Sequence, residues 1–243
     1  MRARTVAALY DVHGNLPALE AVLREVGALR PELVVVGGDV ALGPRPRETL
    51  ERLRALGETV RFVRGNADRE AADGSGEHGG AWVAERLTVE QRDFLGGLPL
   101  TEQVEVDGLG RVVFCHATPR SDEEIVTRVT PEDRLGEALD GVEADVVVCG
   151  HVHVRYDRTV AGTRVVNPGS VGLPYEGEPG AYWALLGPTV SFRRAEYDVP
   201  AAVESIRASG FPGAEEMFVE ALLAPLPPGE VTEYFERMAT ARA

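Results

Sequence analysis

Two short segments of the chain each carry two side chains of metal-binding type with one residue between them. Asp11 and His13 form the first pair, and His151 and His153 form the second. Residues i and i+2 of an extended segment project to the same side, so both members of a pair can contact one ion. Either pair alone is a common pattern, but two such pairs in one chain indicate a metal site.

Three further candidate ligands are spread along the chain. Asp39 follows two glycines, Asn66 follows Gly65, and His116 follows an apolar run. With the two pairs they supply four imidazoles, two carboxylates and one amide oxygen. This donor set suits two borderline divalent ions, with manganese as first choice and iron, zinc or nickel as alternatives, because calcium and magnesium prefer oxygen ligands.

Four of these side chains stand where predicted strands end, namely Asp11, His13, Asp39 and Asn66. Residues 5–10, 33–36 and 59–63 have the apolar character of buried strands, and the pattern predicts helices after the first two. Helices between strands imply parallel pairing with right-handed crossovers. The carboxyl ends of such strands share one sheet edge, where ligands bind, so we expect the polar clusters to converge there.

The second half of the chain is richer in strands. Hairpins are expected for 101–106 with 111–115, 156–160 with 163–166, and 181–186 with 189–194, and a further strand for 145–149. Helices are expected at 88–95, where Thr88 and Gln91 have capping-box spacing, and at 131–139 behind Thr130 as N-cap. We therefore expect a domain over 1–198 and a helical extension over 199–243 that packs on it, broken near 225–228.

The composition narrows the classes of function. The 243-residue chain has a formal net charge of −14, and all 25 basic residues are arginine. A nucleic acid polymer is not expected as a partner, because proteins that bind one present a basic face. The apolar runs are far shorter than the ~20 residues of a membrane span, and no secretory signal is visible. We expect a cytoplasmic protein with no membrane partner, whose Cys115 and Cys149 are buried free thiols.

The ordered motifs resemble those of a known family, the calcineurin-like metallophosphoesterases. Within it they resemble the bacterial and archaeal branch of small phosphodiesterases and proteins related to diadenosine tetraphosphatase. The likeness spans roughly residues 5 to 195. The matching segments are Asp11-Val12-His13-Gly14-Asn15, Gly38-Asp39 with Gly43-Pro44, Gly65-Asn66-Ala67-Asp68, Cys115-His116, Gly150-His151-Val152-His153 and Asn167-Pro168-Gly169-Ser170.

The resemblance implies both a fold and a site. The fold is an α/β four-layer αββα sandwich of two mixed β-sheets flanked by helices. One ion would be held by Asp11, His13, Asp39 and His153, and the other by Asp39 as a shared ligand with Asn66, His116 and His151. The implied reaction is hydrolysis of small phosphodiesters or of phosphoanhydrides such as dinucleoside polyphosphates, through a metal-bridging hydroxide. The catalytic assignments are Asp39, Asn66, His116 and Asp68.

One position departs from the family pattern. A histidine that assists the leaving group commonly follows the ligand asparagine, and Ala67 stands there in this chain. We expect activity restricted to good leaving groups, with Asp68 and His78 left open as substitute acids. Asn15 and Arg120 are the candidates for contacting substrate phosphate, although Asn15 can equally cap the following helix.

Two alternatives stay open. Loss of the histidine at position 67 is a step towards a non-catalytic, metal-binding protein-interaction module on the same fold. The apolar residues of the tail suit either a homodimer contact or packing on the domain.

Overall fold

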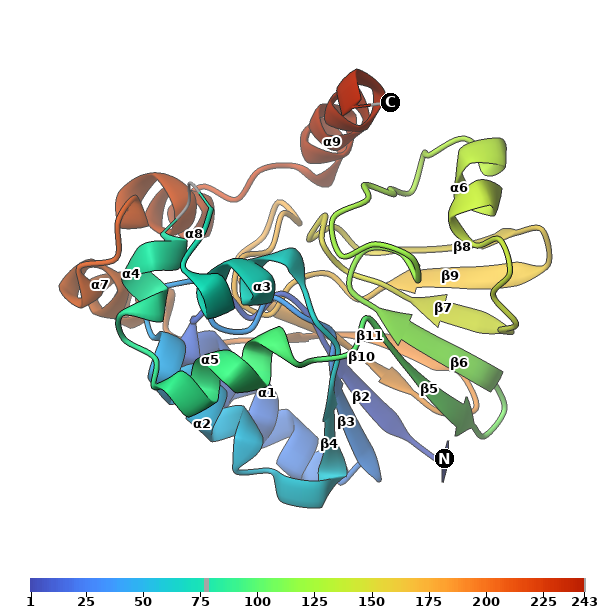
Figure 1. The fold of residues 1–243 in the computed structure, drawn as a ribbon, viewed down its shortest axis with the longest axis horizontal. Coiled ribbons are helices and arrows are strands. Elements are labelled where there is room, and N and C mark those ends of the chain that lie inside the picture. Colours follow the sequence, from blue (N-terminus) through green and yellow to red (C-terminus); the bar gives the residue numbers. More distant parts are fainter. Residues whose placement is uncertain (77–78, 243) are drawn as a thin grey trace.

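Two mixed β-sheets pack face to face in the computed structural model, which describes residues 1–76 and 79–242 (Figure 1). His78, one of the two candidate substitute acids, lies outside the described residues. The first sheet has the strand order β11-β10-β2-β3-β4. Its strands are β2 (Val6–Leu9), β3 (Leu33–Val36), β4 (Val60–Phe62), β10 (Ala181–Leu186) and β11 (Val190–Ala195).

The second sheet has the order β1-β5-β6-β7-β9-β8. Its strands are β1 (Arg2–Ala3), β5 (Thr101–Val106), β6 (Gly110–Cys115), β7 (Val146–Val148), β8 (Tyr156–Val160) and β9 (Thr163–Asn167). In the first sheet β2, β3 and β4 are parallel, and in the second β6, β7 and β9 are parallel. Each sheet therefore has one edge at which several strands end.

Helices cover the outer faces of both sheets. The helices between β2 and β5 are α1 (Leu16–Leu29), α2 (Pro46–Arg54), η1 (Gly57–Thr59), α3 (Asn66–Asp73), α4 (Gly80–Ala84) and α5 (Val89–Gly96). α6 (Glu132–Ala138) packs on the second sheet through Leu135 and Ala138. The C-terminal elements are α7 (Val199–Ser209), the π-helix η2 (Glu215–Val219), α8 (Glu220–Leu223) and α9 (Pro228–Arg242). The predicted four-layer sandwich is confirmed.

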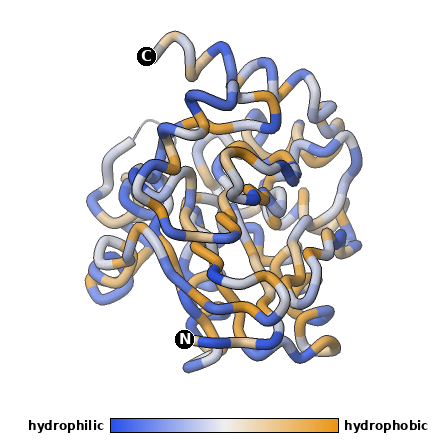
Figure 2. Tube along the Cα trace, turned by 90° about the vertical axis from the view of Figure 1, so that its right-hand side faces the viewer, coloured by the Kyte–Doolittle hydropathy of each residue, from blue (hydrophilic) through white to orange (hydrophobic). Residues whose placement is uncertain are grey.

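The side chains of β2 alternate between two hydrophobic cores, which explains why the layers form. Val6 and Ala8 point into the core between the two sheets, whereas Ala7 and Leu9 join the core beneath the helices. Because strand side chains alternate between faces, an all-apolar strand is buried on both sides. Figure 2 shows these apolar segments passing through the middle of the molecule.

Most predicted elements are found with small changes at their ends. The capping box at Thr88 is present, since the Thr88 hydroxyl accepts from Gln91 N and the Gln91 side chain accepts from Thr88 N. Both cysteines are buried and free, as expected. The prediction of Thr130 as N-cap of α6 was wrong: Pro131 occupies the cap, and the Thr130 hydroxyl instead contacts Thr127 and Glu236. No helix among residues 1–76 and 79–242 is long and apolar enough to cross a membrane.

The C-terminal helix α9 is held to the second sheet largely by side chains. Phe235, Met238 and Ala239 pack against the core of α6 and β7. Between them, the Glu236 carboxylate accepts from the hydroxyls of Thr127, at 2.6 Å, and Thr130, and pairs with Arg134. Figure 1 places α9 at the top of the molecule, separated from α8 by an extended connection.

The pKa of Glu236 determines how the attachment of α9 should depend on pH. Burial would raise the pKa of this carboxyl, but hydrogen bonds from Thr127, Thr130 and Arg134 outweigh burial and lower the pKa below its ordinary value of 4.5. A depressed carboxyl pKa stabilises the fold above the unfolded-state value, and this stabilisation is lost as the pH falls through the folded-state value. We expect hydrogen-exchange protection factors over 228–242 to fall below about pH 4.5, and to be low at neutral pH in Glu236→Ala. Unchanged protection in that variant would contradict the attachment.

Candidate metal centre

The seven candidate ligands lie just beyond strand ends of both sheets. Asp11 and His13 follow β2, and Asp39 follows β3. Asn66 is the first residue of α3, which follows β4 after three residues. From the second sheet, His116 follows β6, and His151 and His153 follow β7. The expected convergence is found for six of these residues, which form two groups.

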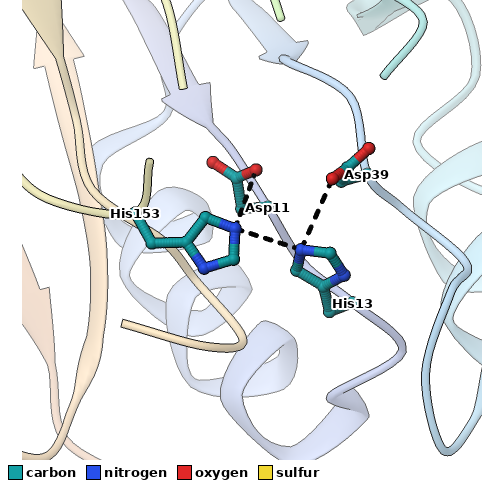
Figure 3. A group of neighbouring side chains, drawn as sticks. All are labelled: Asp11, His13, Asp39 and His153. Carbon is teal, nitrogen blue, oxygen red and sulfur yellow. Dashed lines mark hydrogen bonds and ion pairs between the residues drawn. The ribbon is translucent and has the colours of Figure 1, made fainter. Parts of the chain in front are cut away.

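The first group is Asp11, His13, Asp39 and His153, and the second is Asp39, His116 and His151; each residue offers one ligand atom within 4.8 Å of the others in its group. Figure 3 shows the first group with its carboxylates and imidazoles facing one another. Asp39 Oδ2 lies 3.5 Å from His13 Nε2 and 3.4 Å from His116 Nε2. One carboxylate, that of Asp39, thus belongs to both groups.

Three of the imidazoles are oriented by backbone carbonyls. Nδ1 of His13, His116 and His153 lies 3.1, 2.9 and 2.7 Å from the carbonyl oxygens of Leu42, Gly37 and Leu173 respectively. A carbonyl only accepts, so Nδ1 carries the proton and Nε2 presents its lone pair to the cluster. This is the usual way in which a protein fixes the tautomer of a metal-binding histidine.

In the neutral tautomers that can bind a metal, acceptors face acceptors. His153 Nε2 lies 3.3 Å from Asp11 Oδ1 and 3.2 Å from His13 Nε2, and Asp11 Oδ1 is buried without a hydrogen-bond donor. The side-chain amide of Asn66 also lies at the cluster, 3.1 Å from His151 Nδ1. Buried acceptors without donors are costly unless positive charge lies between them. These residues therefore fit divalent cations.

The pKa shifts within the cluster also indicate a cation site. Burial would raise the pKa of Asp39, but the imidazoles of His116, His13 and His151 outweigh burial and hold this pKa well below its usual range. Burial would lower the pKa of His116, but the Asp39 and Asp11 carboxylates raise it to about 10. Burial and the neighbouring His116 lower the pKa of His151 to about 4. The cluster draws in positive charge, and a cation would displace protons there.

The backbone at these positions adopts a rare conformation. Asp11, His13, Asp39, His151 and His153 have φ between 47° and 69°, the left-handed region. They are five of the seven non-glycine residues with positive φ in the described chain. L-residues seldom adopt this region, and when they do they tend to cluster at functional sites.

Glycine at positions 43 and 65 allows the loops that carry His13 and Asp39 to lie close to their neighbours. A Cβ on Gly65 would lie 2.0 Å from Asp39 Oδ1, and one on Gly43 would lie 1.8 Å from the His13 carbonyl oxygen. Asp68 then ties the same loops together, because its carboxylate accepts from the backbone N–H groups of Asp39, Val40 and Gly65 at 2.8 to 3.0 Å.

The comparisons with known proteins decide the family. Residues 5–187 match the family model described as the calcineurin-like phosphoesterase superfamily domain. The chain belongs to this superfamily. It is therefore a phosphoesterase, an enzyme of the hydrolase class, and the superfamily uses divalent metals.

Three similar proteins show the extent of the likeness. Phosphodiesterase YfcE of Escherichia coli is 29% identical over 187 residues, covering 72% of this chain and 83% of YfcE. The crystal structure of a metallophosphoesterase from Sphaerobacter thermophilus has 28% identity and a TM-score of 0.73, with 92% of this chain and 100% of the other covered. A hypothetical protein of Pyrococcus horikoshii has 26% identity and a TM-score of 0.77, covering 93% and 100%.

The other predicted residues of the phosphoesterase site lie in different surroundings. Asn15 is fully buried, caps α1 by accepting from Ala18 N at 3.3 Å, and donates to the Gly172 carbonyl at 2.8 Å. The Arg120 side chain is 54% exposed and pairs with Glu124 four residues on. The structure thus favours capping for Asn15 and places Arg120 in a surface ion pair.

Ala67, where the family pattern has its acid, and Asp68, one of the two candidate substitute acids, are both buried. Ala67 is 1% exposed within the apolar core that includes Phe218, and its N–H donates to Asp39 Oδ1 at 2.9 Å. The Asp68 carboxylate is fully buried, and burial together with the Asp39 charge raises its pKa to about 7. Because both Asp68 oxygens accept from the backbone, Asp68 acts on the site by holding loops.

Sequence reasoning missed three aromatic rings that lie against the ligand imidazoles. Tyr175 stacks on His153, with centroids 5.3 Å apart and planes 13° apart. Phe218 meets His13 edge-on at 6.5 Å, and Phe235 lies 6.4 Å from His151. Phe218 and Phe235 come from the C-terminal extension, whose apolar residues were the only signal in the sequence.

Proposed function

We propose that this chain is a dinuclear-metal-dependent phosphodiesterase that hydrolyses small phosphodiesters or phosphoanhydrides. The main observation in support is that two groups of buried side chains of metal-binding type share the carboxylate of Asp39. A shared carboxylate holds two cations close together, which mononuclear sites do not need. Manganese is the proposed metal, with iron, zinc or nickel as alternatives, because four imidazoles accompany the oxygen donors.

The proposed ligands divide as the two groups do. Asp11, His13, Asp39 and His153 would hold one ion, and Asp39, Asn66, His116 and His151 the other. When bound, two such ions lower the pKa of water and neutralise charge on a phosphoryl group. The chain's part is to hold its donors in place: backbone carbonyls orient three imidazoles, and Asp68 ties the β3 and β4 loops together.

The neutral Asn66 and the buried Ala67 bear on which esters are cleaved. An amide oxygen adds no negative charge to its ion, so attraction for an anionic substrate is kept. Ala67 offers no proton donor, and its surroundings are apolar. The proposed enzyme therefore relies on leaving groups that depart without a proton, such as phenolates and phosphates.

Leaving-group dependence tests this proposal. A positioned general acid contributes about 10²- to 10⁴-fold, so its absence should make alkyl monoesters poorer substrates than aryl diesters by a similar factor. We expect the logarithm of kcat/KM for manganese-loaded protein to fall steeply with leaving-group pKa across a series of aryl and alkyl esters.

Metal analysis accompanies the same series. Two equivalents of metal per chain are expected, and activity should disappear on chelation and return with manganese. A flat dependence on leaving-group pKa would show that a proton donor acts in the site. Binding of metal without hydrolysis of any ester would favour the alternative, a non-catalytic interaction module.

A further inference from the structure

A pocket of about 470 Å³ opens between α9 and the loop that follows β9. Aromatic rings of Tyr175, Tyr234 and Phe235 line it, with Leu226 and Val231 completing its apolar wall. The volume is within the range of small-molecule sites, roughly 300 to 1,000 Å³. α9 lies outside residues 5–187, the part of the chain that matches the family model, so one wall of the pocket is an addition to the shared domain.

The pocket adjoins both metal groups. Its Tyr175 ring is the one stacked on His153, and Tyr175 N donates to the His153 carbonyl at 3.2 Å. Its Phe235 ring is the one that lies against His151. His153 belongs to one group and His151 to the other. A phosphoryl group held at the cluster would therefore have these two rings among its neighbours.

The charged side chains at the pocket are two acids and one base, Glu230, Glu233 and Arg237. Within residues 1–76 and 79–242, no ion pair or side-chain hydrogen bond engages any of the three, in contrast to the paired Glu236 on the same helix. Two carboxylates disfavour a second anion in the pocket and accept hydrogen bonds from N–H donors. The rings favour a flat partner, since stacking on aromatic side chains stabilises any planar base.

We propose that this pocket binds the planar, amine-bearing base of a nucleoside that is esterified to the phosphoryl group at the metal centre. The proposal rests on the proposed phosphodiesterase function and names its substrate class. Tyr234 and Phe235 stack on the base, and Glu230 or Glu233 accepts from the exocyclic amine. Tyr234 is the more informative ring to remove, because it is 53% exposed, whereas Phe235 also packs on the core.

The test measures binding apart from hydrolysis. Adenosine carries no phosphate, so its dissociation constant can be measured by saturation-transfer and chemical-shift NMR titration with the full chain, with and without manganese. Tyr234→Ala and Phe235→Ala should each weaken adenosine binding about 10-fold or more. Phe192→Ala, which removes a ring of the same kind from exposed β11, should not change it. Purine riboside, which has the same ring system without the exocyclic amine, should bind several-fold more weakly than adenosine.

The outcomes separate the pocket from the proposed function. No adenosine binding, or binding unaffected by Tyr234→Ala, overturns the pocket even when aryl diesters are hydrolysed. Equal binding of adenosine and purine riboside overturns the role of the acids. Adenosine binding that responds to both variants, in a protein that hydrolyses no ester, supports the pocket and counts against the phosphodiesterase. In an active enzyme, Tyr234→Ala should raise KM for the 4-nitrophenyl ester of adenosine 5′-phosphate, which releases a phenolate, about 10-fold.

Discussion

Asp39→Asn is expected to lower metal content from two ions to one or none and to reduce kcat/KM by about 10³-fold or more. The substitution keeps the shape of the side chain but removes the charge that both metal groups share, 3.5 Å from His13 and 3.4 Å from His116. Loss of one electrostatic stabiliser typically costs an active site about 10²- to 10³-fold, and here one side chain serves two ions. Metal per chain by elemental analysis and turnover of an aryl diester measure the two effects.

The control for this variant is Asp107→Asn, which removes a surface carboxylate paired with Arg2. It should change neither quantity. Two bound ions and normal turnover in Asp39→Asn would show that the two groups do not share this ligand.

Gly65→Ala should weaken metal binding about 10- to 100-fold without replacing any proposed ligand. The added Cβ would lie 2.0 Å from Asp39 Oδ1 and 2.6 Å from Asp39 N, distances that force the two loops apart. Overpacking of this kind costs about 1–3 kcal/mol or more, and displacement of a supporting residue typically weakens metal affinity about 10- to 100-fold. Titration of apo-protein with manganese, followed by calorimetry, and thermal unfolding give the two numbers.

A matched glycine replacement separates this steric effect from a general one. Gly27 lies inside α1, and a Cβ added there would meet no atom within 4 Å. Gly27→Ala should therefore leave metal affinity unchanged and stabilise the fold by up to about 1 kcal/mol. Equal metal affinity in Gly65→Ala and Gly27→Ala would mean that the loops tolerate separation.

The strands and the clustering of the proposed ligands could be predicted because their signals are local. Residues 33–36 are uniformly apolar and end at two glycines and Asp39, and the observed β3 has the predicted bounds. Parallel pairing then brings the strand ends to one edge by topology alone. The convergence of His116 and His151 with Asp39 required only that the second sheet face the first.

The features that could not be predicted depend on partners far away in sequence. Thr130 looks like a helix cap, but Glu236, 106 residues later, accepts from its hydroxyl. Ala67 is at a position where the family pattern has a polar side chain, and no local signal shows that an apolar core containing Phe218 surrounds it. Arg120 is the exception, because the partner that engages its guanidinium is local: Glu124 lies only four residues on.

The left-handed backbone of the five proposed ligands also bears on how this lineage can change. Each such residue costs of the order of 1–3 kcal/mol, and their sum rivals the whole net stability of an ordinary domain, about 5–15 kcal/mol. A descendant freed from selection for catalysis would gain stability by accepting glycine at these positions. Loss of these side chains would therefore stabilise the fold of a non-catalytic descendant. Each substitution that restored one of them would lower the stability again.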